Sequence, residues 1–301
     1  MRIVVVGNLG MLGRDLQPGL ERAGYLVRGF DLPELDIRKP REVLDCLKEA
    51  RPGAVVNCAA YTDVDRAESE PGIAFAVNRD GPANLAEACR TLGIPLVHLS
   101  TDYVFDGRAG RAYREDDPAN PINVYGRSKW DGEEAVRSRL DRHIILRTSW
   151  LFGSHGRNFV KTMLELAREK KEIRVVADQH GCPTWTGHLE EAIRVLIDRI
   201  RAGSPGFSWG TYHFCGRGST TWYGFAKAIV AGSRAWEGSA GPRVVPVTTE
   251  EYPTPARRPM RSILDCSKIG EVFGIAARPW REGLREVLRE LGVVAGRGSF
   301  L

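Results

Sequence analysis

The fold is decided by residues 2–13, which read RIVVVGNLGMLG. A mostly apolar run suited to a buried strand leads into three glycines spaced G-x-x-G-x-x-G, and a helical pattern follows from residue 13 to about residue 24. Glycine lets the backbone approach a ligand closely, and the N-terminus of the next helix offers free N–H groups to an anion. We therefore predict a turn that binds a dinucleotide pyrophosphate, although a glycine triplet alone also fits a structural turn. The residues predicted to form it are Gly7, Leu9, Gly10, Met11, Leu12 and Gly13.

Strand and helix signals alternate outward from this turn. Apolar strands are expected at 25–30, 54–58, 95–100 and 143–148, and helices at 40–50, 73–92 and 124–140. This order predicts an α/β fold of the Rossmann type, a doubly wound parallel sheet covered by helices on both faces. The sequence thus predicts a dinucleotide-binding domain at 1–150.

The alternation of strand and helix signals becomes less regular after residue 150. Strand-like pieces at 173–176 and 211–215 alternate with helical patterns at 187–202, 222–233 and 280–291. We expect residues 151–301 to form mainly a smaller substrate-binding lobe, with segments that cross back to the sheet.

Asp31 directly follows the second predicted strand, where a carboxylate accepts hydrogen bonds from the ribose hydroxyls of a dinucleotide. This acid favours NADH, whereas the nearby Arg28 and Arg38 would suit NADPH, so the sequence leaves both cofactors open. Asp36 and Ile37 are predicted to flank the adenine. Small residues after the strand at 54–58 would let the cofactor lie against the sheet edge, and the predicted contacts there are Ala59, Ala60 and Tyr61.

Tyr125 and Lys129 stand four residues apart at the start of a predicted helix, so they share one face. A neighbouring ammonium is expected to lower the pKa of a phenol and help it donate a proton to a carbonyl. Lys129 would also bind the nicotinamide ribose. Tyr-x-x-x-Lys on its own is more often structural, but Thr101 ends a predicted strand where its hydroxyl would polarise the same carbonyl. The predicted catalytic residues are therefore Thr101, Tyr125 and Lys129.

The composition excludes several other classes of protein. The formal net charge of +5 is dispersed over 301 residues, which argues against a nucleic-acid-binding protein. No apolar run is long enough to cross a membrane, and the N-terminal run is too short for a signal peptide. The six cysteines show no C-x-x-C pair and no local partner. We expect free thiols in a cytoplasmic protein, without a disulfide or metal framework.

Several segments resemble the dTDP-4-dehydrorhamnose reductase family along nearly the whole chain. They include HLSTDYVFDG, NVYGRSKWDGE, LRTSWLFG, ADQHGCPTW and YPTPARRP. The resemblance implies reduction by NADPH or NADH of the C4 keto group of dTDP-4-dehydro-6-deoxy-L-mannose, giving dTDP-L-rhamnose. It places Thr101, Asp102, Tyr103, Tyr125 and Trp150 near the sugar, although Trp150 also fits a core position. Arg257 and Arg258 are predicted for the diphosphate, with a surface role as the alternative.

Other interpretations stay open beside this one. The chain also fits an epimerase or dehydratase of the same extended short-chain dehydrogenase family, or a non-catalytic regulatory subunit of the same fold. Some family members form dimers through Mg²⁺ bound by glutamates, and this chain has Asp15 where one such acid is expected. We predict no metal and allow for a homodimer.

Overall fold

The computed structural model describes residues 1–203, 207–233 and 241–294. Within these ranges, six parallel strands form the main sheet in the order β10-β5-β4-β3-β1-β2. Their bounds are β1 (Arg2–Val6), β2 (Leu26–Phe30), β3 (Ala54–Asn57), β4 (Leu96–Thr101), β5 (His143–Thr148) and β10 (Gly210–His213). The strand order reverses between β1 and β3, which is where open α/β sheets bind ligands.

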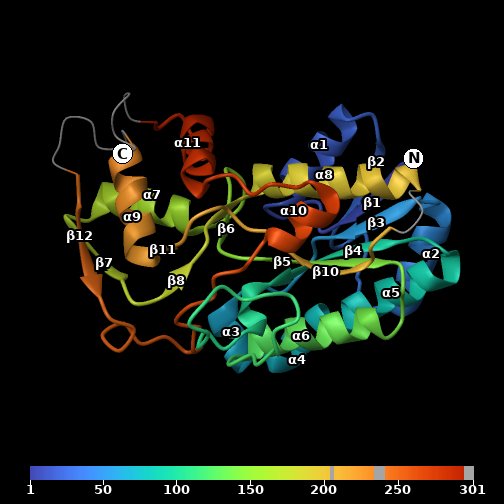
Figure 1. The fold of residues 1–301 in the computed structure, drawn as a ribbon, viewed down its shortest axis with the longest axis horizontal. Coiled ribbons are helices and arrows are strands. Elements are labelled where there is room, and N and C mark those ends of the chain that lie inside the picture. Colours follow the sequence, from blue (N-terminus) through green and yellow to red (C-terminus); the bar gives the residue numbers. More distant parts are fainter. Residues whose placement is uncertain (204–206, 234–240, 295–301) are drawn as a thin grey trace.

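Helices cover both faces of this sheet (Figure 1). One face carries α1 (Gly13–Arg22), α8 (Thr186–Ala202) and α10 (Ser267–Phe273), and the other carries α2 (Pro40–Ala50), α5 (Gly81–Leu92) and α6 (Val124–Arg137). Side chains of β1 alternate between them: Ile3 and Val5 enter one core, and Val4 and Val6 enter the other. The predicted doubly wound α/β fold is confirmed.

The helix expected at 73–92 is interrupted. The chain forms α3 (Val64–Ser69), α4 (Pro71–Phe75) and then a π-helical turn at Ala76–Asp80 before α5 begins. The wider turn carries Asn78, whose side chain is fully buried. This side chain accepts a hydrogen bond from the N–H of Tyr61 and donates to the carbonyl of Tyr61 and to the hydroxyl of Ser128. Apolar periodicity does not reveal a single inserted residue, so the sequence predicted one continuous helix.

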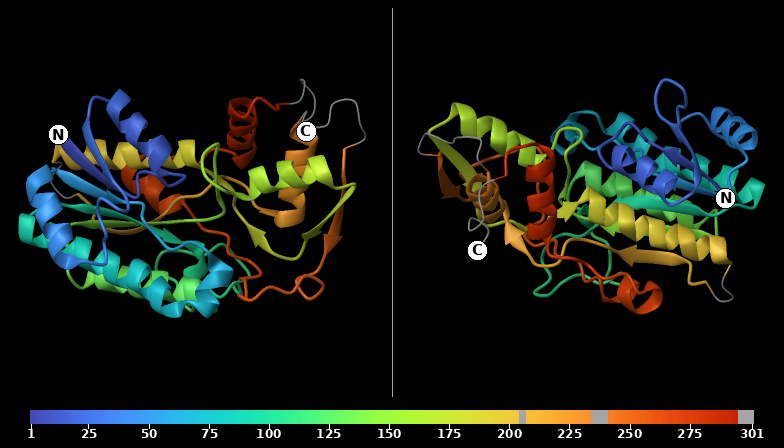
Figure 2. Two further views of the ribbon diagram at one scale, coloured as in Figure 1. Left: turned by 180° about the vertical axis from the view of Figure 1, so that it is seen from behind. Right: turned by 90° about the horizontal axis from the view of Figure 1, so that it is seen from above.

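A smaller lobe lies beside the sheet (Figure 2). Its core is formed by α7 (Phe159–Glu169), α9 (Trp222–Gly232) and α11 (Trp280–Glu290). Three strand pairs complete it: β7 (Glu172–Val176) with β12 (Arg243–Val247), β6 (Leu151–Phe152) with β9 (Thr184–Trp185), and β8 (His180–Gly181) with β11 (Thr220–Thr221).

Three elements from the second half of the chain pack with the sheet instead of this lobe. They are α8, β10, which pairs with β5 at the sheet edge, and α10. The last residues of the predicted lobe, 295–301, lie outside the described residues. No helix in the described part of the chain has the length and apolarity needed to span a membrane.

Candidate active site

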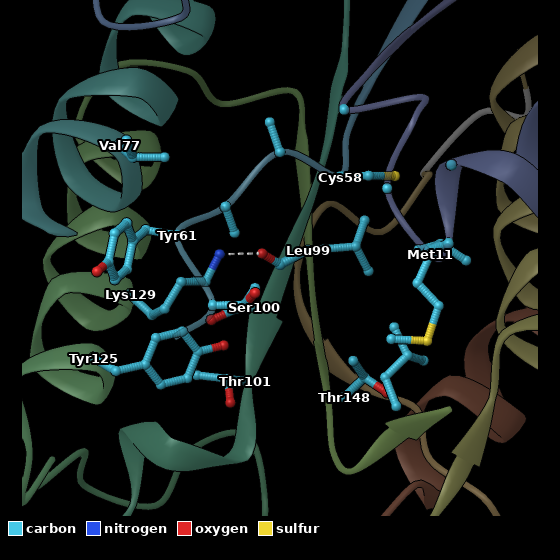
Figure 3. Close-up of a pocket in the computed structure, with 18 of the residues that line it drawn as sticks. Met11, Cys58, Tyr61, Val77, Leu99, Ser100, Thr101, Tyr125, Lys129 and Thr148 are labelled. Atoms are coloured by element: carbon cyan, nitrogen blue, oxygen red, sulfur yellow. Dashed lines mark hydrogen bonds between the residues drawn. The ribbon is translucent and has the colours of Figure 1, made fainter. Parts of the chain in front are cut away.

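A cavity of about 810 Å³ opens at the carboxyl ends of the strands around the β1/β3 reversal (Figure 3). It brings together most of the predicted site residues: Gly7, Gly10, Met11, Leu12, Gly13, Asp31, Asp36, Ile37, Ala59, Ala60, Tyr61, Thr101, Asp102, Tyr103, Tyr125, Lys129 and Trp150. Leu9, Arg257 and Arg258 are not among the residues that line it.

The glycine turn has the geometry of a phosphate cradle. Gly7 has a φ of +80°, and a Cβ there would lie 2.5 Å from the backbone nitrogen of Ala59, so a side chain at this position is excluded. Gly13 is equally confined, because a Cβ would lie 2.3 Å from the Gly7 carbonyl oxygen. In the described chain, the backbone N–H groups of Met11 and Leu12 have no protein acceptor. Unpaired donors at the start of α1 fit the diphosphate of a dinucleotide.

Asp31 ties this turn to the end of β2. Its carboxylate accepts hydrogen bonds from the backbone N–H of Leu9 at 3.1 Å and of Leu32 at 2.8 Å. Leu9 therefore contributes its backbone N–H to this link between the turn and β2, while its side chain is 56% exposed.

The two basic residues that would suit NADPH are both engaged. Arg38 donates two hydrogen bonds to the buried Asp36, at 2.8 and 2.7 Å, and these bonds are the main reason why the pKa of Asp36 is lowered. Arg28 pairs with Glu49 at 3.2 Å. Both guanidinium groups already pair with a carboxylate, so a 2′-phosphate would have to share them.

Tyr125 lies in the first turn of α6, which begins at the N-cap Asn123 through its hydrogen bond from the N–H of Gly126 at 2.7 Å. The Tyr125 hydroxyl faces Thr101 (Figure 3). Burial raises the pKa of Tyr125 to about 12; a hydrogen bond with Thr101 lowers it and the charge of Asp102 raises it. The expectation that the ammonium of Lys129 lowers the pKa of this phenol is therefore wrong for this structure: burial is the largest influence on that pKa, and Lys129 is not among the groups that shift it.

Lys129 is buried on the same face of α6, one turn further on. Its Nζ donates a hydrogen bond of 2.6 Å to the carbonyl of Leu99 (Figure 3). Burial lowers the pKa of Lys129 to about 8, against the opposing effects of Glu133 and Cys58. The site therefore holds a firmly protonated phenol beside an amine that loses its charge easily.

Thr101 ends β4 and connects the tyrosine to a buried carboxyl group. Its hydroxyl donates to Asp102 at 3.2 Å and accepts from the N–H of Tyr103 at 3.2 Å. Asp102 also accepts a hydrogen bond from Ser262, yet burial raises its pKa to about 7.

A buried ion-pair network, which the sequence did not predict, supports this wall of the cavity. Glu133, one turn after Lys129, accepts hydrogen bonds from Arg147 at 2.9 and 2.8 Å and from the hydroxyl of Ser100. Both charged side chains are at most 1% exposed. The sequence does place Glu133 on the same helix face as Lys129, four residues later. Its partner Arg147 lies in β5, however, and only the folded chain brings the two together.

Trp150 lines the cavity in a constrained conformation. Its φ is +45°, and its ring stacks on Trp222 with centroids 3.6 Å apart and planes 6° apart. A Cβ at Gly181 would lie 2.3 Å from the Trp150 ring. The ring is thus fixed between a glycine and a second tryptophan, and Trp222, which also lines the cavity, was not predicted.

Arg258 does not line the cavity and pairs with Asp65 of α3, with N···O distances of 2.7 and 3.1 Å. Arg257 is exposed, and its carbonyl accepts a hydrogen bond from Asn123 at 2.7 Å. Both arginines belong to residues 254–258, here called the crossing segment, which contact α3 beside the site.

All six cysteines are free thiols. Three of them meet although they are far apart in the sequence: the Sγ atoms of Cys215 and Cys266 are 3.5 Å apart, and Cys182 interacts with Cys215. Over the described ranges, no group of three or more His, Cys, Asp and Glu side chains is placed to hold a metal ion.

A glycine turn at the β1/β3 reversal facing a Thr–Tyr–Lys group defines the extended short-chain dehydrogenase/reductase class. Comparisons with known proteins narrow this assignment. The model of the RmlD substrate binding domain family matches residues 1–293, and the chain belongs to that family.

The relatives match nearly the full length of the chain. A dTDP-4-dehydrorhamnose reductase of Sinorhizobium fredii (strain NBRC 101917 / NGR234) is 42% identical over 290 residues, covering 96% of this chain and 97% of the relative. A probable dTDP-4,6-dihydroxy-2-methyloxan-3-one 4-ketoreductase of Streptomyces antibioticus is also 42% identical, over 97% of this chain and 96% of that protein. The crystal structure of a Bacillus anthracis dTDP-4-dehydrorhamnose reductase in complex with NADP is 40% identical, with a TM-score of 0.88 over 96% of this chain and 99% of that one.

Proposed function

We propose that this protein uses NADPH or NADH to reduce the C4 keto group of dTDP-4-dehydro-6-deoxy-L-mannose to dTDP-L-rhamnose. One observation carries the proposal: Thr101, Tyr125 and Lys129 converge on a cavity whose opposite side is a glycine phosphate cradle. The family membership and the names of the relatives support the substrate.

The dinucleotide, when bound, supplies the hydride that adds to C4. Tyr125 donates its phenolic proton to the ketone oxygen, so that the carbonyl becomes an alcohol and the tyrosine a phenolate. A pKa of about 12 keeps the phenol protonated at neutral pH, which is the form that reduction requires. Thr101 orients the carbonyl, and the ammonium of Lys129 stabilises the phenolate until solvent returns the proton.

The smaller lobe is proposed to bind the sugar nucleotide. Trp150 and Trp222 bring an aromatic wall to the cavity from that side, and aromatic faces pack well against the apolar face of a sugar. Asp102 and Tyr103 are proposed to contact the sugar. Arg257 and Arg258 are the proposed diphosphate ligands; because Asp65 already holds Arg258, that residue would have to share its guanidinium.

The direct test is oxidation of NADH and NADPH by the purified protein, with and without the 4-keto sugar nucleotide. We expect oxidation only with the sugar nucleotide, and faster with NADH because Arg28 and Arg38 are both paired. No oxidation with authentic substrate would refute the proposal. Tightly retained cofactor without net oxidation would instead favour an epimerase.

Tyr125→Phe should lower kcat by about 10²–10⁴-fold, the usual contribution of a positioned proton donor, while dinucleotide binding stays within about twofold. The matched control is Tyr252→Phe, because Tyr252 is 51% exposed and does not line the cavity. Turnover that survives in the Tyr125→Phe variant would show that another group donates the proton.

A different 4-keto sugar nucleotide is the second candidate substrate, favoured by the similarity to the Streptomyces antibioticus ketoreductase. Measuring kcat/KM for several 4-keto sugars decides between the two. We further infer a cytoplasmic location, since six free thiols suit a reducing compartment, and a homodimer, which size measurement in solution tests.

A further inference from the structure

Arg157 is a cation of the cavity that the protein itself leaves unpaired. The basic side chains in the lining are Arg38, Lys129 and Arg157. Arg38 binds Asp36, and Lys129 binds the carbonyl of Leu99. Arg157 is exposed, and in the described ranges it makes no hydrogen bond and no ion pair.

The loop that carries Arg157, residues 153–158, is anchored at both ends. The buried Asn158 donates a hydrogen bond of 2.8 Å to the carbonyl of Gly153 and caps α7 by accepting from the N–H of Lys161 at 3.3 Å. His155 lies 3.5 Å from the carboxylate of Asp15 on α1. The loop is therefore fixed beside the helix whose N-terminus faces the cavity.

The same loop lies against the glycine turn. Gly156 has a φ of +63°, and a Cβ there would lie 3.4 Å from the Cβ of Met11. Met11 carries one of the backbone N–H groups that have no acceptor in the described chain. Arg157 thus directly follows a glycine that leaves room only for ordinary packing against the phosphate cradle.

We infer that Arg157 binds the diphosphate of a nucleotide ligand, on the side of the cradle that the glycine turn leaves open. The inference rests on the proposed function, which supplies two such ligands: the dinucleotide and the sugar nucleotide. A diphosphate is a doubly charged anion with several acceptor oxygens, and a guanidinium matches it with two parallel hydrogen bonds. This role explains why an arginine with no carboxylate partner stands in a cavity.

Calorimetric binding of two probes separates the two sources. ADP-ribose carries the diphosphate of the dinucleotide, and thymidine diphosphate carries that of the sugar nucleotide. Arg157→Gln should weaken binding of at least one probe about tenfold, the effect expected of a charge-assisted hydrogen bond that remains partly exposed. Arg157→Lys should recover only part of the loss, because an ammonium lacks the fork. The loss should shrink at high salt.

Arg168→Gln is the matched control, because Arg168 is an exposed arginine on the adjoining α7 that does not line the cavity. A loss for ADP-ribose assigns Arg157 to the dinucleotide, and a loss for thymidine diphosphate assigns it to the sugar nucleotide. Affinities within twofold of wild type for both probes would overturn the inference. Neither probe needs turnover, so a protein that binds them but reduces no keto sugar would contradict only the proposed function. Unchanged thermal unfolding of the Arg157→Gln variant would show that its fold is intact.

Discussion

At the scale of single residues, Tyr125 and Lys129 differ in how burial affects them. Burial opposes the charged form of each group, so it raises the pKa of the phenol to about 12 and lowers the pKa of the amine to about 8. Between pH 8 and pH 12 the phenol therefore keeps its proton while the amine is neutral. The amine, rather than the tyrosine, sets the alkaline limit of the site.

The rate constant kcat/KM should accordingly fall above about pH 8 as Lys129 loses its charge. Lys129→Arg should have a lower maximum but no decline between pH 8 and pH 10, because a guanidinium stays protonated there. The measurement is a pH profile of kcat/KM for both proteins. An alkaline decline that persists unchanged in the Lys129→Arg variant would assign it to another group.

Asp102 is a carboxyl group whose burial destabilises the fold at neutral pH. Its pKa rises from an ordinary 3.8 to about 7. Between pH 4 and pH 7 this carboxyl group is therefore ionised in the unfolded chain but protonated in the folded one, so the free energy of unfolding falls as the pH rises. The shift of about three pKa units corresponds to at most about 4 kcal/mol.

Asp102→Asn should therefore unfold at a higher temperature than wild type at pH 8, and the difference should vanish near pH 4. The variant should also lose activity, since Asp102 orients Thr101. Asp116→Asn, at an exposed position, is the control and should show no such trend. An equal difference in melting temperature at both pH values would contradict the prediction.

At the scale of secondary structure, the sequence predicted what short-range patterns encode. Apolar runs located the central strands, and the glycine turn located the start of α1 to the residue. The π-helical turn at Ala76–Asp80 was not predicted, because the contacts that hold it are distant in the sequence. Its Asn78 is hydrogen-bonded to Tyr61 and Ser128, which lie 17 and 50 positions away. The expected strand at 211–215 exists as β10, but its place beside β5 depends on pairing across 66 positions.

Asn78 connects α6 to the loop after β3, so its removal should affect both stability and catalysis. Asn78→Ala removes three hydrogen bonds made by a fully buried side chain and should cost about 3 kcal/mol of unfolding free energy. It should also lower kcat, because α6 carries Tyr125 and Lys129. Asn84→Ala on the same helical run removes a single bond, to the carbonyl of Ile37, and should cost about 1 kcal/mol without lowering kcat. Denaturant titration and kinetics of both variants check this; equal costs would contradict it.

At the scale of the whole molecule, the site could be predicted where it follows the sheet. Thr101, Asp31 and the glycine turn lie at strand ends, and parallel strands bring their carboxyl ends to one edge. Site residues from the second half of the chain could not be located from the sequence, because their positions depend on how the chain returns across the site. Arg258 meets Asp65 across 193 positions, and no local pattern encodes that contact.

The Asp65–Arg258 contact holds the crossing segment against α3. Asp65 accepts hydrogen bonds from Arg258 and from the N–H of Ala256, and Val64, its neighbour in α3, lines the cavity. Asp65→Ala should cost about 1–2 kcal/mol of unfolding free energy, because the pair is only partly exposed and Arg258 is left without its carboxylate. It should also raise KM for the sugar nucleotide several-fold.

The dinucleotide site provides the internal control for this change. The glycine turn connects β1 to α1, whereas Asp65 is hydrogen-bonded to the crossing segment. Dinucleotide affinity should therefore stay within about twofold in Asp65→Ala. Adding Arg258→Gln should cause little further loss of stability, since residues joined in one ion pair show non-additive effects. Fully additive losses would mean that the two residues act independently. A parallel loss of dinucleotide affinity would mean that the crossing segment supports the whole cavity, not the sugar side alone.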